Sequence, residues 1–178
     1  MPMQDLSSVL WCERDLLETL QYKLEVEQLV LDCGRAHRLA TAAREVETVV
    51  DRIRALEVLR ALEVDVLVGE LGLTSGATLH DIAVASAEPW RTIWLDHRSA
   101  LLTVTAEITA GTARVHELLV GRKDPVPVPL QATAAGRSRP GGVLTDDAVD
   151  RELQVLARDL AVGAVARAFQ PSLHDFLS

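Results

Sequence analysis

Residues 10–31, LWCERDLLETLQYKLEVEQLVL, decide the fold class, because their leucines recur with a helical period. Four of these leucines lie seven residues apart and a fifth lies one turn from its neighbours; they are Leu10, Leu17, Leu20, Leu24 and Leu31. Such spacing places apolar side chains along one narrow stripe of a helix, where they can pack against a partner helix. The stretch therefore predicts a long amphipathic helix.

The residues around this stripe indicate where the helix begins and ends. Ser7 and Ser8 can accept hydrogen bonds from the free amides of a helix start, and Gly34 can adopt the left-handed conformation that ends a helix. We therefore expect a helix over 8–32. Charged residues fill the remaining positions, and we expect them, Glu13 and Glu27 included, to lie on the other faces.

A second long helix is predicted over 36–71. Its apolar residues are spaced alternately three and four apart, and they are Leu39, Ala42, Val46, Val49, Ile53 and Leu56. We expect the same stripe to continue through Leu59, Leu62, Val66 and Leu71, with its position shifting slightly around the helix. We expect Gly72 to end the helix. At about 1.5 Å per residue this helix is about 50 Å long, so its partner helices must be long too.

Two further helices are predicted before residue 122. Thr78 and Asp81 have the spacing of a capping box, which predicts a short helix over 79–86. A third long helix is predicted over 90–120, because apolar and aromatic residues again alternate in steps of three and four. The seam of this helix consists of Trp90, Ile93 or Trp94, His97, Leu101, Val104, Ile108, Gly111, Val115 and Leu118.

His97 and the two tryptophans each allow a functional and a structural interpretation. His97 could act as a pH switch, or it could be a seam histidine that is hydrogen-bonded to its neighbours, and we favour the second. Trp90 and Trp94 lie one turn apart and could anchor a partner. Because they begin a core-facing stripe, we expect them to pack inside the protein.

The chain changes character after residue 121. Prolines and glycines without a helical period predict a linker over 122–144, and an amphipathic pattern then predicts a helix over 145–169, which Pro171 ends. We therefore divide the chain into a helical bundle over 1–121, the linker, and a C-terminal helix and tail over 145–178. The predicted fold class is all-α: an elongated antiparallel bundle or coiled coil of three long helices, with a short helix and a C-terminal amphipathic helix.

The composition narrows the classes of partner. The net charge is -8, which argues against binding to nucleic acid or to an anionic membrane surface. No apolar run approaches the roughly 20 residues that cross a bilayer, and the N-terminal residues lack the pattern of a signal peptide. Cys12 and Cys33 lie far apart, as expected of reduced thiols. We therefore expect a cytoplasmic protein without membrane insertion.

We expect no enzymatic activity, no metal and no cofactor, because the residues that such chemistry needs are not spaced for it. No glutamate is followed three residues later by histidine, a pair that binds di-iron centres in helical bundles. No two histidines lie four residues apart, as a zinc-binding helix requires. The sequence also lacks a glycine-rich phosphate loop and a nucleophile elbow. We therefore predict no catalytic residue.

Four stretches, taken in order, carry a resemblance to a known family. They are LWCERDLLETLQYKLEVEQLVL at 10–31, REVETVVDRIRALEVLRALEVDVLVGELGL at 44–73, EPWRTIWLDHRSALLTVTAEI at 88–108 and QPSLHDFL at 170–177. This order resembles the FlgN family of flagellar export chaperones, in the form found in high-GC Gram-positive bacteria. The sequence departs from the family at one point, because FlgN proteins often carry an asparagine late in the third helix and this chain contains none.

The resemblance implies a cytosolic chaperone that acts by binding alone. Its clients would be the hook-filament junction proteins, which it would keep from assembling too early and deliver to the export apparatus, whose components would be further partners. The resemblance also implies that the client binds the C-terminal part of the chain. The apolar residues of that part are our candidate partner-binding residues: Leu153, Leu156, Leu160, Phe169, Leu173, Phe176 and Leu177.

Two alternatives stay open at this point. The C-terminal helix either folds back on the bundle or presents its apolar face to another protein. In the first case the chain could be a structural or scaffolding helical bundle with no export role. The chain could also be a monomer or a homodimer, because a heptad stripe can close within one chain or between two.

Overall fold

The computed structural model describes residues 1–121, 159, 163 and 171–178. Its helices are α1 (Pro2–Asp32), α2 (Ala36–Leu71), α3 (Leu79–Ala85), α4 (Trp90–Gly121) and α6 (Pro171–Leu177). The described residues contain no strand, so the predicted all-α class is confirmed. The predicted linker over 122–144 and almost all of the predicted helix over 145–169 lie outside the described residues.

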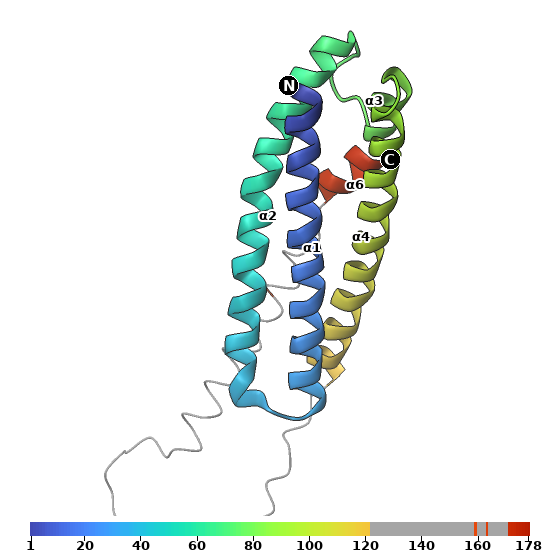
Figure 1. Cartoon of the computed structure of the whole chain (residues 1–178). Coiled ribbons are helices and arrows are strands. Elements are labelled where there is room, and N and C mark those ends of the chain that lie inside the picture. Colours follow the sequence, from blue (N-terminus) through green and yellow to red (C-terminus); the bar gives the residue numbers. More distant parts are fainter. Residues whose placement is uncertain (122–158, 160–162, 164–170) are drawn as a thin grey trace, which may run out of the picture.

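The three long helices lie side by side along one direction, as Figure 1 shows. α1 packs against α2 on one side and against α4 on the other, and it is therefore the central helix of the three. α2 runs in the opposite direction to both α1 and α4. The short helices α3 and α6 lie toward the end that holds the N-terminus. The described part of the molecule is elongated along its long helices.

α1 begins at Pro2, well before the predicted start at Ser8. Proline is tolerated at the first position of a helix, because the N–H group that it lacks has no partner there and its backbone angle already suits a helix. Ser8 lies inside the helix, where its hydroxyl donates a hydrogen bond of 2.8 Å to the carbonyl oxygen of Gln4. The prediction that a serine caps α1 is therefore wrong.

The end of α1, the end of α2 and the start of α3 follow the sequence signals. Gly34 and Gly72 have φ angles of 66° and 67°, in the left-handed region that glycine adopts at the end of a helix. After Gly72, the N–H of Leu73 donates to the carbonyl oxygen of Val68 at 3.0 Å and closes the end of α2. The predicted capping box at the start of α3 is confirmed: the Thr78 hydroxyl accepts from the N–H of Asp81, whose carboxylate accepts from the N–H of Thr78.

The core contains the leucine stripe of α1 together with apolar faces of α2 and α4. All five leucines of the stripe are buried as predicted: Leu10, Leu17, Leu20, Leu24 and Leu31. The prediction for Glu13 and Glu27 is wrong, because both side chains are fully buried. Each glutamate lies three residues after one leucine of the stripe and four before another. Helix geometry therefore places it on the buried face whatever its charge.

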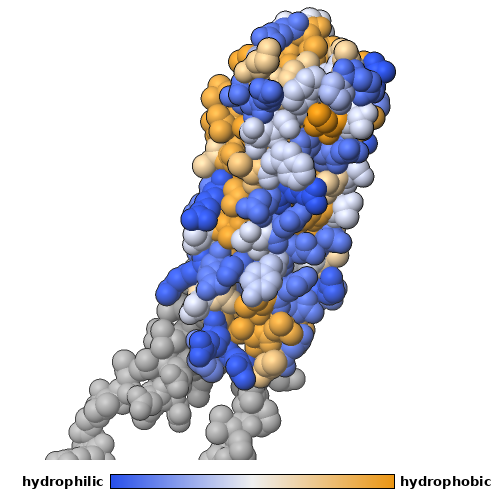
Figure 2. Space-filling model, viewed as in Figure 1, coloured by the Kyte–Doolittle hydropathy of each residue, from blue (hydrophilic) through white to orange (hydrophobic). Residues whose placement is uncertain are grey.

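The predicted course of the apolar face of α2 is wrong at Leu59, Leu62 and Val66, whereas Leu71 packs against the core as predicted. Leu59, Leu62 and Val66 are 43%, 59% and 53% exposed. The buried face continues instead through Arg60 and Leu67, which are 5% and 0% exposed. The three apolar residues lie on the outer side of α2, and Figure 2 shows hydrophobic side chains along the upper left edge of the molecule, where α2 lies.

Candidate functional site

The candidate partner-binding residues that the structure describes belong to α6. Leu173 and Leu177 lie four residues apart on one face of this helix and are 1% and 0% exposed. Phe176 is partly buried and packs against the same core. α6 contacts α3 and α4, and Figure 1 shows it lying across the long helices. A helix of seven residues is not stable alone, so these contacts hold it in place.

The other candidate residues are not placed by the structure. Leu153, Leu156, Leu160 and Phe169 lie outside the described residues. The structure therefore brings Leu173, Phe176 and Leu177 together on the body of the protein.

Arg98 of α4 holds the end of α6. Its Nε donates a hydrogen bond of 2.7 Å to the carbonyl oxygen of Leu177, and its Nη2 donates one of 3.2 Å to the backbone oxygen of Ser178. The last carbonyl groups of a helix have no partner within the helix and carry a partial negative charge. The Arg98 guanidinium therefore supplies hydrogen-bond donors to the last carbonyl groups of α6, which the burial of Leu177 would otherwise leave without partners.

A buried ion pair between α1 and α2 lies next to α6. Nη1 of Arg60 donates to Oε1 of Glu13 at 2.6 Å, and the two side chains are 6% and 0% exposed. The second oxygen of Glu13, Oε2, has no hydrogen-bond partner in the structure. Burial raises the pKa of the Glu13 carboxyl, although the attraction of Arg60 acts in the opposite direction. Removing Arg60 would leave the Glu13 carboxyl buried without a compensating charge.

The same ion pair connects α2 to α6. The Arg60 guanidinium carbon lies 5.0 Å from the centre of the Phe176 ring, within the range of a cation–π contact. Glu57 lies one turn before Arg60 and accepts a hydrogen bond of 2.6 Å from the hydroxyl of Ser172. Glu13, Glu57 and Arg60 thus form a charged cluster that contacts both Ser172 and Phe176.

Aromatic side chains surround His97 at the start of α4. Trp94 is fully buried, and its Nε1–H donates to the Ser86 hydroxyl at 3.2 Å. Trp90 is partly buried and stacks on Trp94 with ring centres 5.3 Å apart. The prediction that these tryptophans pack inside the protein is confirmed for Trp94 and in part for Trp90.

His97 has the structural role that its position on the seam predicts. It is 4% exposed, and its Nε2 shares a hydrogen bond of 3.1 Å with the Ser7 hydroxyl. Its ring lies edge-on to Trp11, with centres 5.1 Å apart. Burial lowers the pKa of His97, and the charge of Arg14 lowers it further. Its ring is therefore neutral at physiological pH and serves packing.

Glu27 is a buried carboxyl group without a partner. Its side chain is fully buried, and neither Oε1 nor Oε2 accepts or donates a hydrogen bond in the structure. Burial raises its pKa from 4.5 to about 7, because the charged form loses its hydration there. The protonation of Glu27 therefore depends on pH close to neutrality.

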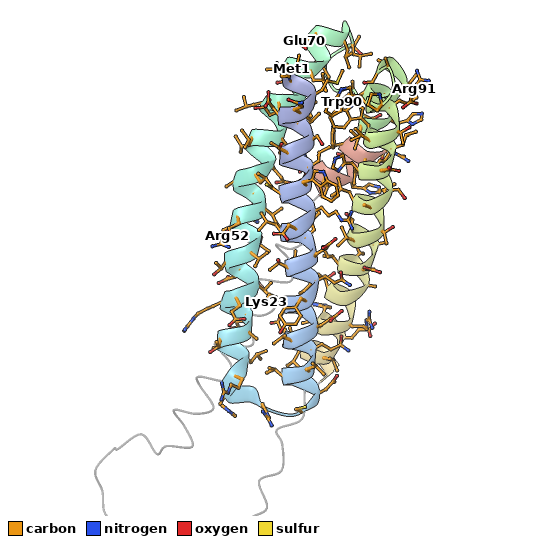
Figure 3. The ribbon with its side chains drawn as sticks, in the orientation of Figure 1. Met1, Lys23, Arg52, Glu70, Trp90 and Arg91 are labelled. Carbon is orange, nitrogen blue, oxygen red and sulfur yellow. The ribbon has the colours of Figure 1, made fainter. Side chains whose placement is uncertain are left out.

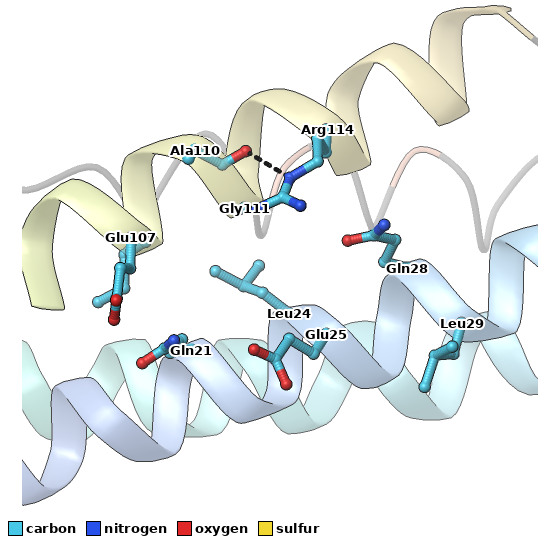
Figure 4. Close-up of a pocket in the computed structure, with 10 residues that line it drawn as sticks. Gln21, Leu24, Glu25, Gln28, Leu29, Glu107, Ala110, Gly111 and Arg114 are labelled. Atoms are coloured by element: carbon cyan, nitrogen blue, oxygen red, sulfur yellow. Dashed lines mark hydrogen bonds between the residues drawn. The ribbon is translucent and has the colours of Figure 1, made fainter.

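A shallow surface groove runs between α1 and α4 (Figure 4). Gly111 faces Leu24 in this groove, and an added Cβ at Gly111 would make an ordinary van der Waals contact with the Leu24 side chain at 3.9 Å. Its rim is polar, and the Arg114 side chain is held by a hydrogen bond of 3.3 Å from Nε to the carbonyl oxygen of Ala110. The lining residues offer no set of ligands for a cofactor.

The described residues hold no group of three or more histidine, cysteine, aspartate or glutamate side chains placed to bind a metal ion. Among these same residues, no helix combines the length and the apolar character needed to cross a membrane. Cys12 and Cys33 are exposed free thiols. The polar clusters described above, around Arg60 and Arg98, join the helices to one another.

Comparison with known proteins yields no match: neither a protein-family model, nor a curated protein, nor a solved structure is similar to this chain.

The residues that hold α6 were not found from the sequence. Glu13 and Arg60 lie 47 residues apart, and their pairing depends on the alignment of α1 and α2. Glu13 could have been placed on the buried face, because it continues the alternating steps of the leucine stripe. Arg98 gives no such signal, because its partners are backbone atoms at the far end of the chain.

Proposed function

We propose that this protein is a FlgN-like chaperone of type III flagellar export. It binds hook-filament junction proteins in the cytosol, prevents their premature assembly and delivers them to the export apparatus. The sequence resemblance over 10–31, 44–73, 88–108 and 170–177 supports this proposal. So does the all-helical structure of the described residues, because a helical surface can cover the amphipathic ends of client proteins.

The observation that carries the proposal is the docking of α6. The body of the protein receives a short amphipathic helix through two leucines four residues apart, and Arg98 binds the last carbonyl groups of that helix. Junction proteins carry amphipathic terminal segments that would self-associate when free. A chaperone that releases α6 from its body and binds such a segment with the apolar face of α6, Phe176 included, loses little apolar burial in the exchange.

In this proposal the elongated antiparallel bundle of α1, α2 and α4 is the frame, and the C-terminal part is the binding surface. The predicted helix over 145–169 contributes Leu153, Leu156, Leu160 and Phe169, and α6 contributes Leu173, Phe176 and Leu177. The chain acts by binding and release, without covalent chemistry.

Co-purification with a recombinant hook-filament junction protein tests the proposal. The full chain should retain the junction protein, and Phe176→Ala should weaken binding about tenfold, the loss of about 1.4 kcal/mol that a contact aromatic ring supplies. Val84→Ala is the matched control, because Val84 is an exposed apolar residue on α3. A full chain that retains no junction protein would rule out this function.

The burial of Leu173 and Leu177 favours a second candidate, a structural or scaffolding helical bundle with no export role. In a scaffold, α6 completes the core permanently. Hydrogen exchange of the α6 amides separates the two functions. A scaffold keeps these amides protected when junction protein is added, whereas a chaperone that binds its client through α6 changes their protection.

A further inference from the structure

We propose that the outer face of α2 is a self-association surface, on which α2 of a second copy of this chain packs in the opposite direction. The face is formed by four exposed apolar residues, Val58, Leu59, Leu62 and Val66, which we call the α2 stripe. Their side chains are 64%, 43%, 59% and 53% exposed. This inference concerns a different surface from the one that α6 occupies, and it does not depend on the proposed function.

The α2 stripe is a continuous helix face that nothing in the described chain covers. Its members are spaced one, three and four residues apart, which places them on one side of a helix over more than two turns. The opposite side of α2, with Arg60 and Leu67, packs toward α1. Other exposed apolar side chains, such as Leu29, belong to other helices. An uninterrupted apolar strip on a surface helix is typical of a protein–protein contact.

Charged residues flank the α2 stripe with opposite signs at its two ends. Arg52 and Arg54 precede the stripe, and Asp65 and Glu70 lie at its far end. All four side chains are exposed, and Figure 3 labels Arg52 and Glu70 well apart along α2. Asp51 offsets part of the positive charge, because its carboxylate lies 3.7 Å from the Arg54 guanidinium. The stripe is therefore basic at its start and acidic at its end.

This charge pattern selects the partner and its direction. Two copies of α2 that pack in the same direction bring basic end to basic end and acidic end to acidic end, which is unfavourable. Two copies in opposite directions bring Arg52 and Arg54 of one chain to the acidic end of the other. The surface is then complementary to itself, as the interface of a two-fold symmetric dimer must be.

The spacing of residues fits such a dimer. With the two-fold axis between Leu59 and Leu62, each Leu59 faces the partner's Leu62. Arg52 lies seven residues before Leu59, opposite the partner's Gly69, and the partner's Glu70 is the next residue, about 1.5 Å further along the helix, so Arg52 lies beside the partner's Glu70. Both residues lie on the same flank of α2, which antiparallel helices bring together across a two-fold axis. By symmetry, the Leu59–Leu62 contact and the Arg52–Glu70 pair each occur twice in the dimer.

The expected association is moderate in strength. A single helix face buries less than the ~800 Å² per partner of a standard stable interface. We therefore expect a dissociation constant in the micromolar range, which corresponds to about 8 kcal/mol at 1 μM. The monomer and the dimer then coexist at concentrations that are easily reached in solution.

Sedimentation velocity of the full chain between ~1 μM and ~500 μM tests this inference. The wild-type protein should shift from monomer to dimer across this range, and Leu62→Glu should remain monomeric throughout. Leu29→Glu is the matched control, because Leu29 is 62% exposed on α1, away from the α2 stripe, and this variant should dimerise like the wild type. A wild-type protein that stays monomeric at ~500 μM overturns the proposal, as does equal disruption by Leu29→Glu.

Charge reversal tests the direction of packing without placing a charge on the apolar stripe. Arg52→Glu and Glu70→Arg should each raise the dissociation constant about tenfold, because each places like charges opposite one another. The double variant restores opposite charges across the two-fold axis and should return to within about threefold of the wild type. Circular dichroism checks that each variant keeps its helices. A folded double variant that dimerises as weakly as the single variants overturns the proposed arrangement.

Discussion

Replacing Glu27 by glutamine should remove a pH dependence from the stability of this protein. The Glu27 side chain is fully buried without a hydrogen-bond partner, and burial raises its pKa from 4.5 to about 7. The folded state therefore binds this proton more tightly than the unfolded state does. Stability is highest while the carboxyl is protonated in both states, below its unfolded pKa, and it falls as the pH rises from 4.5 to about 7.

The size of the effect follows from the two pKa values. Each pH unit between them is worth about 1.4 kcal/mol, so the ionised side chain lowers the free energy of unfolding by about 3 kcal/mol above pH 7. Glutamine has a similar shape and stays neutral, although its amide still has to be buried. We expect Glu27→Gln to be about 2 kcal/mol more stable than the wild type near pH 8, and equally or less stable near pH 5.

Urea unfolding followed by circular dichroism, at several values between about pH 5 and about pH 8, measures this difference. Glu25→Gln is the control, because it makes the same change of charge at an exposed neighbouring position of α1. Its free energy of unfolding should follow that of the wild type at every pH. The reasoning is refuted if the curves of Glu27→Gln and the wild type run parallel across this range.

Three further changes test the contacts that join the helices. Arg60→Met should lower the free energy of unfolding by about 3 kcal/mol, because it leaves the Glu13 carboxylate buried alone; adding Glu13→Leu should recover most of that loss in the same urea assay. Leu173→Ala should cost about 2 to 4 kcal/mol if α6 is docked as described, and a loss below about 0.5 kcal/mol would contradict that docking. Arg98→Ala should speed hydrogen exchange in α6 at least about fivefold, corresponding to about 1 kcal/mol, and leave exchange in the middle of α1 unchanged.

Much of the fold could be predicted from local sequence patterns. The bounds of α2, α3 and α4 agree with the prediction to within a residue, because Gly72, the capping box at Thr78 and the heptad spacing act within a few residues of each helix end. The start of α1 was predicted wrongly because two signals compete. Pro2 can begin a helix as well as Ser8 can, and the apolar residues between them favour the earlier start.

The errors in the core have one physical cause. Glu13 and Glu27 were expected to face solvent because they are charged, whereas helix geometry carries the buried face of α1 through their positions. On α2, Leu59 and Leu62 were assigned to the core because they are apolar, although both lie on the exposed side of the helix. Which face of α2 is buried depends on where Arg60 meets Glu13, and no pattern within α2 contains that information.

The candidate site could be predicted only as a segment. The residues after Pro171 were predicted as a tail, and this is wrong, because Pro171 begins the helix α6 and places Leu173 and Leu177 on one of its faces. The sequence does not say whether that face meets the body of the same protein or a partner. The contacts of Arg98 with the backbone of Leu177 and Ser178 bring together positions 79 and 80 residues apart in the sequence. Such pairings become visible only when the whole chain is folded.

The Glu13–Arg60 pair also determines how far α1 can slide along α2. Two leucine-rich stripes fit together almost equally well when one helix shifts by a heptad, about 10 Å, because similar side chains return to similar places. Only one of these alignments sets the 2.6 Å contact between Glu13 and Arg60, and every other leaves two charges buried apart at a cost of several kcal/mol. The pair therefore favours one alignment of α1 and α2 over the shifted ones. A double variant with Glu13→Leu and Arg60→Met would keep most of its stability and lose the penalty that excludes shifted alignments.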